Sequence, residues 1–250
     1  ETGHSVSNLI IRTITGTGLV LLVLAGLAYA PLGVGVLWLS GVLILYEVSR
    51  MHAQTRRTWL YASGLYTLGG IASRLLLGLP GGILVYKAMA GLVLVCVLYE
   101  LYRRQLYDYK PVYYGLRLSV LLSSGLYLYH KSPETLLFGL VILWLTDTAA
   151  MIIGRFIGGP KLAPAISPGK TIAGSVGAWG IIALGGLALG YGWVPAIVSL
   201  AGQLGDLHES LAKRHAGVKD SSALLPGHGR VYDRLDSTLV GLPMLCILVV

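Results

Sequence analysis

The stretch LVILWLTDTAAMIIG, residues 140–154, decides the class of fold. It is an apolar run with one ionisable residue, Asp147, and no basic residue lies within seven positions of it. Apolar runs of about 20 residues cross the hydrocarbon core of a bilayer as helices. A carboxylate in that core costs about 3 kcal/mol unless it is paired or binds a cation. The stretch therefore predicts a membrane helix with either a functional acid or a carboxyl satisfied by Ser, Thr or Lys from a neighbouring helix.

The rest of the chain has the same apolar character. Its 250 residues are 55% hydrophobic and 12% charged, with a mean hydropathy of +0.73, whereas soluble domains carry about 25% charged residues. We predict an all-α, polytopic integral membrane protein with about nine transmembrane helices. The predicted spans are residues 9–30, 32–48, 59–78, 82–101, 114–129, 135–153, 172–190, 193–211 and 237–250.

The basic residues predict the orientation in the membrane. Sixteen of the 19 Lys and Arg residues flank one side, at the amino end and after the second, fourth, sixth and eighth spans. The positive-inside rule makes that side cytoplasmic. The rule and anionic lipid headgroups also account for the net charge of +8, so no nucleic-acid partner is expected. We predict a multi-pass protein of the cell membrane whose site faces the cytoplasm.

Two cytoplasmic connections are candidates for the site, residues 154–174 and 205–237. Both are rich in glycine, proline and charge, whereas the connections on the opposite side are short. Functional residues are commonly carried by loops that a rigid scaffold holds in place. We expect one integral membrane domain, 1–250, in which 1–140 supply scaffold and lipid-facing helices and 141–250 supply the catalytic helices and loops.

Acidic residues in i, i+3 pairs mark the edges of two spans. Asp206 and Glu209 form one pair, and an ordinary helix-end ion pair with Lys213 explains Glu209. Asp206 lies one helical turn deeper in the predicted membrane span than Glu209, so contact with water alone does not explain a charged residue there. Asp233 and Asp236 form the second pair at the start of the last span; a helix dipole stabilises one acid but two repel.

These acids together favour a hard divalent cation. Carboxylate oxygens without a Cys/His cluster are ligands for Mg²⁺ rather than Zn²⁺. The helix-dipole and ion-pair explanations stay open as structural alternatives for individual residues.

Anion-binding features lie beside the acids. SPGKT, residues 167–171, opens a helix, where backbone N–H groups and Lys170 are expected to bind a phosphate. It is not a Walker A loop, because Pro164 occupies the position where that loop needs glycine. PGHG, residues 226–229, is a flexible turn with His228 at its tip, which we expect to touch substrate, although loop histidines are often solvent-exposed bystanders.

Two blocks resemble a known family. The pattern SLAKR-x4-KD-x5-PGHG-x3-DRLD, Ser210 to Asp236, and the stretch from Leu145 to Gly174 are similar to the phosphatidate cytidylyltransferase (CDP-diacylglycerol synthase) family. They cover about the last 40% of the chain. The earlier part agrees only in being hydrophobic, with ILYEVSR at 44–50 as a faint echo. Arg230 stands where the family usually has glycine.

The resemblance implies an enzyme that joins CTP to phosphatidate, with Mg²⁺ and a second cation such as K⁺. Membrane lipids are further partners, and both a monomer and a homodimer stay open. The implied metal ligands are Asp147, Asp206, Asp233 and Asp236. The implied catalytic residues are Asp206, Asp233, Asp236, His228 and Lys213. The implied substrate-binding residues are Lys161, Ser167, Lys170, Thr171, Arg214, Lys219, Asp220 and Arg234.

Two other functions compete with this one. A CTP-dependent polyprenol or lipid kinase would use the same nucleotide but transfer its terminal phosphoryl group. A cation-coupled transporter would also place acids in membrane helices, but with its site near the midplane between repeats. The acids here cluster at one surface beside phosphate-binding loops, which disfavours the transporter.

Overall fold

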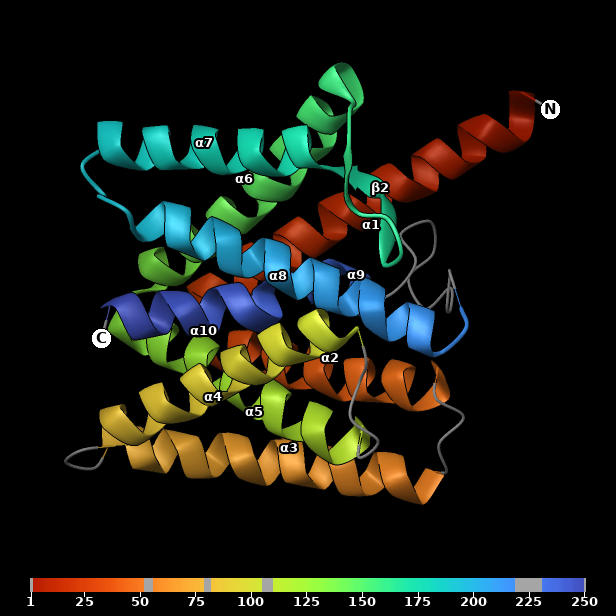
Figure 1. Cartoon of the computed structure of the whole chain (residues 1–250). Coiled ribbons are helices and arrows are strands. Elements are labelled where there is room, and N and C mark those ends of the chain that lie inside the picture. The colour runs from red at the N-terminus through yellow and green to blue at the C-terminus, as the bar shows by residue number, and fades with distance from the viewer. Residues whose placement is uncertain (1, 52–55, 79–81, 105–109, 219–230, 250) are drawn as a thin grey trace.

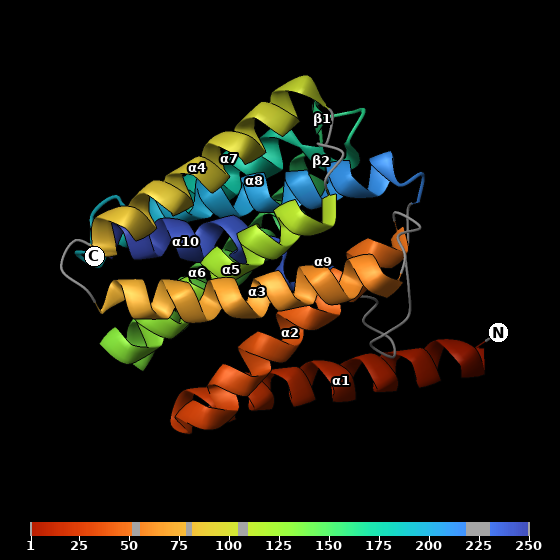
Figure 2. The same cartoon turned by 90° about the horizontal axis from the view of Figure 1, so that it is seen from below.

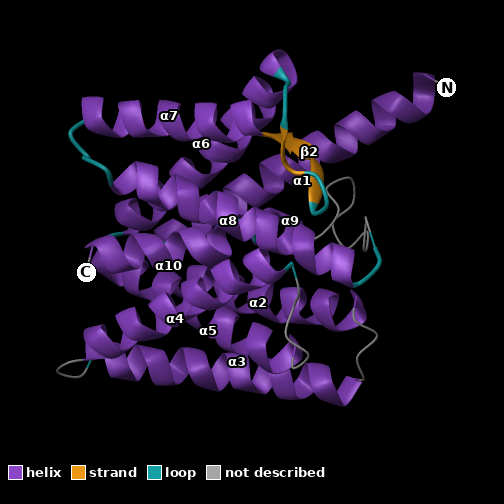
Figure 3. Cartoon of the chain, in the orientation of Figure 1, coloured by secondary structure: helices purple, strands orange, loops and turns teal. Residues whose placement is uncertain are grey.

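The computed structural model describes residues 2–51, 56–78, 82–104, 110–218 and 231–249. These residues form helices and one small hairpin (Figures 1 and 3). The elements are α1 (Thr2–Ala28), α2 (Ala30–Met51), α3 (Arg56–Leu77), α4 (Gly82–Arg103), α5 (Lys110–Lys131), α6 (Pro133–Ile157), β1 (Lys161–Ala163), β2 (Ser167–Thr171), α7 (Ile172–Ala188), α8 (Val194–His215), α9 (Tyr232–Leu235) and α10 (Thr238–Val249).

The expectation of a helical membrane protein is confirmed at a coarse level. A helix coincides with every predicted span. Within the described ranges, α2, α4 and α6 are long and apolar enough to cross a bilayer, while Thr13–Ala28 and α7 are shorter apolar helices. The figure of nine transmembrane helices stays a prediction.

From the sequence we expect a loop between α6 and α7, and the structure has a small hairpin there. There, β1 pairs antiparallel with β2, with Lys161 opposite Thr171 and Ala163 opposite Ser167. Gly158 and Gly159 adopt φ angles of 67° and 88°, a region that favours glycine, and so end α6 and redirect the chain. The Thr171 side chain then caps α7 by accepting from Gly174 N–H at 3.0 Å. The hairpin is therefore fixed at both of its ends.

The helices surround α8 and α10, which lie side by side in the middle of the molecule (Figure 1). Helices α6 and α7 pack together on one side of this pair, and α2 to α5 lie on the other (Figures 1 and 2). Helix α1 lies at the outer edge against α2 (Figure 2). The hairpin, α9 and the carboxyl ends of α2, α4 and α8 are at one end of the bundle, and the carboxyl terminus is at the other (Figures 1 and 2).

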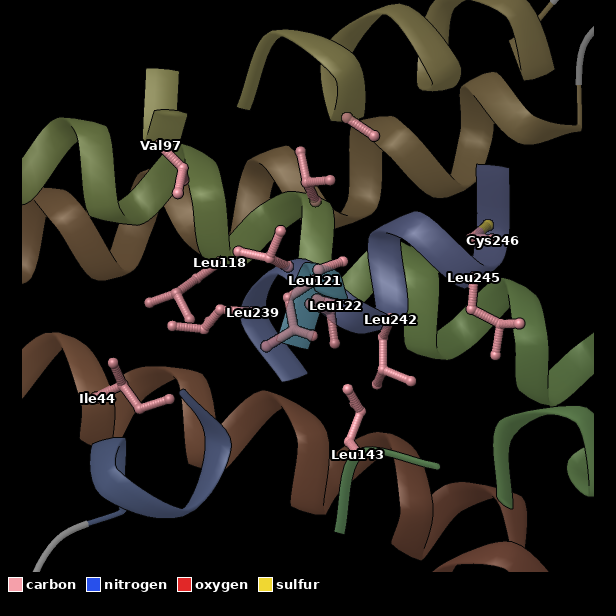
Figure 4. Close-up of a cluster of buried hydrophobic side chains, with 14 of the residues drawn as sticks. Ile44, Val97, Leu118, Leu121, Leu122, Leu143, Leu239, Leu242, Leu245 and Cys246 are labelled. Atoms are coloured by element: carbon pink, nitrogen blue, oxygen red, sulfur yellow. The ribbon is translucent and has the colours of Figure 1, made fainter. Parts of the chain in front are cut away.

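Part of the buried core lies where α5, α6 and α10 meet. Leu121 and Leu122 of α5 gather with Leu239 and Leu242 of α10, and Leu143 of α6 lies at the edge of this group (Figure 4). Large apolar side chains are instead exposed on outward helix faces. Such a surface fits a lipid environment, since apolar patches of this extent are rare on soluble monomers. Examples are Leu21, Leu68, Leu84 and Leu184.

Candidate active site

Three carboxylates from two separate segments meet at the hairpin end of the bundle. Asp206 and Glu209 lie on α8, and Asp236 lies between α9 and α10. One oxygen of each lies within 4.8 Å of the others. The sequence predicts Asp206 and Asp236 as metal ligands and assigns Glu209 to an ion pair. In the structure, Glu209 forms the ion pair with Lys213 and also lies in the acid cluster.

Gly205 allows this convergence. A Cβ at this position would lie 2.4 Å from the Asp236 carbonyl oxygen, far closer than a carbon and an oxygen can pack. Helix α8 therefore touches the backbone at the start of α10 only because the residue has no side chain. The neighbouring Asp206 is thereby brought close to Asp236.

The crowding of acids has an electrostatic consequence. Burial, and then the nearby carboxylates of Asp206 and Asp147, raise the pKa of Asp236 well above its usual range. Ser237 N–H donates to Asp236 Oδ1 at 2.7 Å, which partly opposes this effect. Without a cation, the charged form of Asp236 is disfavoured in the folded protein. The donor set therefore fits a hard divalent cation.

Two lysines pair with the acids. Lys170 of β2 forms an ion pair with Asp206. Lys213 contacts Glu209 at 2.7 Å, as the i, i+4 spacing predicts, and also Asp233 at 3.0 Å. Lys213 thus neutralises the negative charge of Asp233, a residue that the sequence assigns to metal binding.

Asp147 borders the same cluster from α6. Its Oδ2 accepts a hydrogen bond from Ser237 Oγ at 3.2 Å. This is the kind of partner that the structural alternative for Asp147 requires. Asp147 also lines a cavity together with Asp206.

The cavity lies between the hairpin and helices α6 to α8, with a volume of about 550 Å³. Its charged lining combines two acids with three cations. Such a lining suits a ligand that carries phosphate groups together with a metal ion. The charged residues and one amide of the lining are Asp147, Arg155, Lys161, Lys170, Gln203 and Asp206.

The remaining predicted residues divide by position. Thr171 lines the cavity, but its hydroxyl caps α7. Arg214 Nε donates to the Ile166 carbonyl at 3.1 Å, so Arg214 ties the hairpin turn to α8. Ser167 is half-buried at the start of β2, and Arg234 is exposed on α9. Lys219, Asp220 and His228 lie outside the described residues, as does Arg230.

Arg155 and Gln203 are cavity residues that sequence reasoning missed. Arg155 follows Asp147 by eight positions, which places the two on one face of α6 through Met151 at i+4. Gln203 precedes Asp206 by three positions on α8 and forms hydrogen bonds with Ser175 of α7. The helical spacing from each acid is the signal that could have found them.

Glu47 of α2 is a further residue that sequence reasoning left without a role. Its carboxylate accepts from Val231 N–H at 3.2 Å and from Tyr232 N–H at 2.9 Å. The side chain is buried, with 2% exposure. The amino-terminal half of the chain therefore reaches the segment that carries Asp233 and Asp236.

A second buried polar network joins α4, α5 and α8. His208 Nε2–H donates to Glu100 Oε2 at 2.6 Å, which leaves Nδ1 to accept from Arg117 Nη1 at 3.0 Å. Arg117 also lies over the rings of Tyr113 and Tyr114. Arg117 is one of the 16 basic residues counted above for the orientation, as a residue that flanks the connection after the fourth span. The structure places it in α5, 1% exposed inside the bundle, where it contributes to packing.

Comparison with known proteins adds a family likeness. A family model described as the cytidylyltransferase family matches residues 10–250. The phosphatidate cytidylyltransferase of Staphylococcus saprophyticus is 45% identical over 145 residues, which are 50% of this chain and 54% of that protein. The one from Staphylococcus aureus is 47% identical over 126 residues, 46% of this chain and 48% of the relative. The chain thus spans about half the length of the curated relatives it matches.

Proposed function

The chain belongs to the cytidylyltransferase family, and from this premise we propose that it is a phosphatidate cytidylyltransferase. It would transfer CMP from CTP to phosphatidate and yield CDP-diacylglycerol and pyrophosphate. The observation that carries the proposal is the acid cluster of Asp206, Glu209 and Asp236 beside a cavity lined by Arg155, Lys161 and Lys170. The names of the relatives support the choice of lipid substrate.

The reaction joins two anions. A lipid phosphate oxygen attacks the α-phosphorus of CTP, and the bond from that phosphorus to the oxygen bridging toward the β-phosphate breaks. Pyrophosphate leaves with that oxygen. The lipid phosphate has a second pKa of about 6, so it is largely ionised near neutral pH and needs no strong base. The side chains must therefore hold and neutralise phosphates more than they must remove protons.

The cations of the cavity supply that neutralisation. Lys170 pairs with Asp206, and it would move its charge to a nucleotide phosphate once a metal ion takes over the carboxylate. Arg155 and Lys161 line the same cavity and are exposed, which leaves their charges available for the triphosphate. Positive groups fixed in place in this way stabilise charge that develops during phosphoryl transfer.

Mg²⁺ would be held by Asp206 and Asp236, with Glu209 or Asp147 beside them. When bound, it supplies positive charge to the phosphates and lets the crowded carboxyls ionise together. A second cation, such as K⁺, is proposed from the resemblance in the sequence. Asp233 remains a proposed neighbour of the metal through Lys213, which it shares with Glu209.

The proposed setting is a cell membrane crossed about nine times, with the site facing the cytoplasm. The acid cluster lies at the same end as the basic carboxyl ends of α2, α4 and α8. That placement agrees with the positive-inside rule. CTP would reach the cavity from the aqueous side while the diacyl tails remain in the bilayer.

Product analysis tests the proposal. Purified protein is incubated with Mg²⁺, with phosphatidate and a polyprenol as the two lipid acceptors, and with CTP labelled either at the α-phosphate or at the γ-phosphate, and the lipids are extracted. Label from the α-position in CDP-diacylglycerol is the expected result. Label from the γ-position in lipid would instead identify a lipid kinase, and no labelled lipid from either nucleotide would refute both enzymes.

A further inference from the structure

Glu47 is a buried carboxylate whose contacts lead toward the acid cluster. It lies near the carboxyl end of α2, and its two oxygens accept from consecutive backbone N–H groups, those of Val231 and Tyr232. Asp233 comes directly after these donors in the chain, and Asp236 comes one turn later. The first N–H groups of a helix have no partner within the helix. Glu47 supplies partners for two of them from another helix.

The segment from Tyr232 to Asp236 is held from two sides. On one side, the paired hydrogen bonds to Glu47 fix both the position and the rotation of its first turn. On the other side, Gly205 of α8 packs against the Asp236 carbonyl. Tyr232 itself is fully buried, and its ring makes a T-shaped contact with the ring of Tyr114 of α5. A shift of this segment would change the distance between Asp236 and the α8 acids.

We propose that Glu47 is a positioning residue for the metal site: it holds the α9 backbone so that Asp236 meets Asp206 and Glu209. The inference rests on the proposed function in one respect, because it takes this acid cluster as the metal site. Glu47 acts through the backbone of α9, and we assign it no contact with substrate. Residues that orient metal ligands commonly change metal affinity about 10–100-fold when they are replaced.

The test replaces Glu47 by glutamine, which keeps the length of the side chain and one acceptor oxygen but places an NH₂ group against the second N–H. Mn²⁺ serves as the probe, and its affinity for the full chain in detergent is measured by electron paramagnetic resonance. We expect Glu47→Gln to weaken Mn²⁺ binding about tenfold. In metal-free protein, amide hydrogen exchange at Val231 and Tyr232 should become faster. The Mg²⁺ concentration for half-maximal CDP-lipid formation should rise by a similar factor.

Tyr66→Phe is the matched control. The Tyr66 hydroxyl is buried and donates to the Leu37 carbonyl of α2 at 3.0 Å, so its loss also removes a buried hydrogen bond to α2. This variant should lower the unfolding temperature without changing Mn²⁺ affinity. Should Glu47→Gln fail to fold, Glu47→Asp keeps the charge on a shorter side chain and is expected to show the same weakening of Mn²⁺ binding.

The outcomes separate this inference from the proposed function. Weaker Mn²⁺ binding and faster exchange in the Glu47 variants support the inference even if the parent makes no CDP-lipid. Unchanged Mn²⁺ affinity and exchange in the Glu47 variants overturn the inference even if the parent is fully active. A parent that binds no Mn²⁺ overturns it as well, because Glu47 would then have no metal geometry to set.

Discussion

Individual side chains at the acid cluster are arranged for a bound cation more than for stability. Ionising Asp236 costs free energy in the folded protein, because burial and the carboxylates of Asp206 and Asp147 raise its pKa. When folding raises the pKa of a carboxyl, the free energy of unfolding of the protein falls as the pH rises through that pKa. The metal-free protein should therefore tolerate the loss of this charge, whereas the metal-bound enzyme should not.

Asp236→Asn should separate activity from stability. Removing the charge should lower CDP-lipid formation by about 100-fold or more, because Asp236 is proposed to be a ligand of the metal. The unfolding temperature in EDTA should be unchanged or higher, since a disfavoured charge is removed. Both are measured on protein in detergent, by lipid extraction and by a thermal scan. Activity within a few-fold of the parent would contradict the assignment of Asp236 to the metal.

Lys170→Ala should mainly weaken the use of CTP. Charge-assisted hydrogen bonds contribute about 1.5–3 kcal/mol, so the KM for CTP should rise about tenfold or more. Lys87→Ala is the control for removing a lysine from this protein. Lys87 lies near the amino end of α4, away from the end of the bundle that carries the acid cluster, so this change should leave the KM for CTP unchanged. Steady-state rates at varied CTP provide the measurement. An unchanged KM in Lys170→Ala would leave this lysine with a structural role only, as the partner of Asp206.

At the scale of the elements, the contact between α8 and the start of α10 determines whether the acids meet. Helix α8 carries Asp206 and Glu209. Its Gly205, which has no side chain, lets the backbone of α8 lie against the Asp236 backbone. The hairpin then brings Lys170 over this contact, and Arg214 ties the hairpin turn back to α8. The site thus depends on how closely the elements approach as well as on the side chains.

Gly205→Ala tests that dependence. The added Cβ would lie 2.4 Å from the Asp236 carbonyl oxygen, so α8 and α10 must separate. Overpacking of this kind typically costs about 1–3 kcal/mol, and the activity should fall with the stability. Gly91→Ala on α4 is the control, because its Cβ would meet open space. Unfolding temperature and CDP-lipid formation are compared; parent-like values for both in Gly205→Ala would refute the close contact.

The helices could be predicted from the sequence, but the hairpin could not. Apolar runs give the helices from α2 to α8, and α10, to within a few residues, because only helices satisfy the backbone of a long apolar segment in lipid. Helix α1 begins seven residues before its predicted span, and the short α9 lies outside every predicted span. Strands β1 and β2 have three and five residues, which is too short to show a clear alternation of apolar and polar residues. Their pairing depends on the glycines that end α6 and on the α8 residue Arg214. Sequence patterns record such contacts only indirectly.

The site could be predicted only where its residues share a short stretch of chain. Asp206 and Asp236 stand out because acids are rare in apolar segments, and Lys170 stands out beside a helix start. Glu47 is likewise an acid inside a predicted span, 32–48, but its relation to the site comes from helices that pack together in space, which no local pattern shows. Glu209 was visible as an ion pair with Lys213 but not as a neighbour of Asp236, which lies 27 positions away.

At the scale of the whole molecule, buried charges tie the amino-terminal helices to α8. Glu100 of α4, Arg117 of α5 and His208 of α8 form one network with almost no exposure. Removing one member of such a group leaves an uncompensated charge, which typically costs about 3–5 kcal/mol. The network thus makes the two halves of the chain depend on each other.

Arg117→Met should therefore destabilise the protein by about 3 kcal/mol or more. Adding Glu100→Gln to it should recover part of that loss, because the remaining carboxylate charge is then removed. Thermal unfolding of both variants in detergent measures the effect. An Arg117→Met variant as stable as the parent, or a double variant no more stable than Arg117→Met, would argue against an ionic network.

The bonds from Glu47 to Val231 and Tyr232 bridge 184 and 185 positions of the chain. During synthesis, α2 would enter the translocon long before its partner leaves the ribosome. The nascent chain can hold no assembled acid cluster until residue 236 has emerged and been inserted. A chain released before that point would therefore lack the cluster, whatever helices it has already formed.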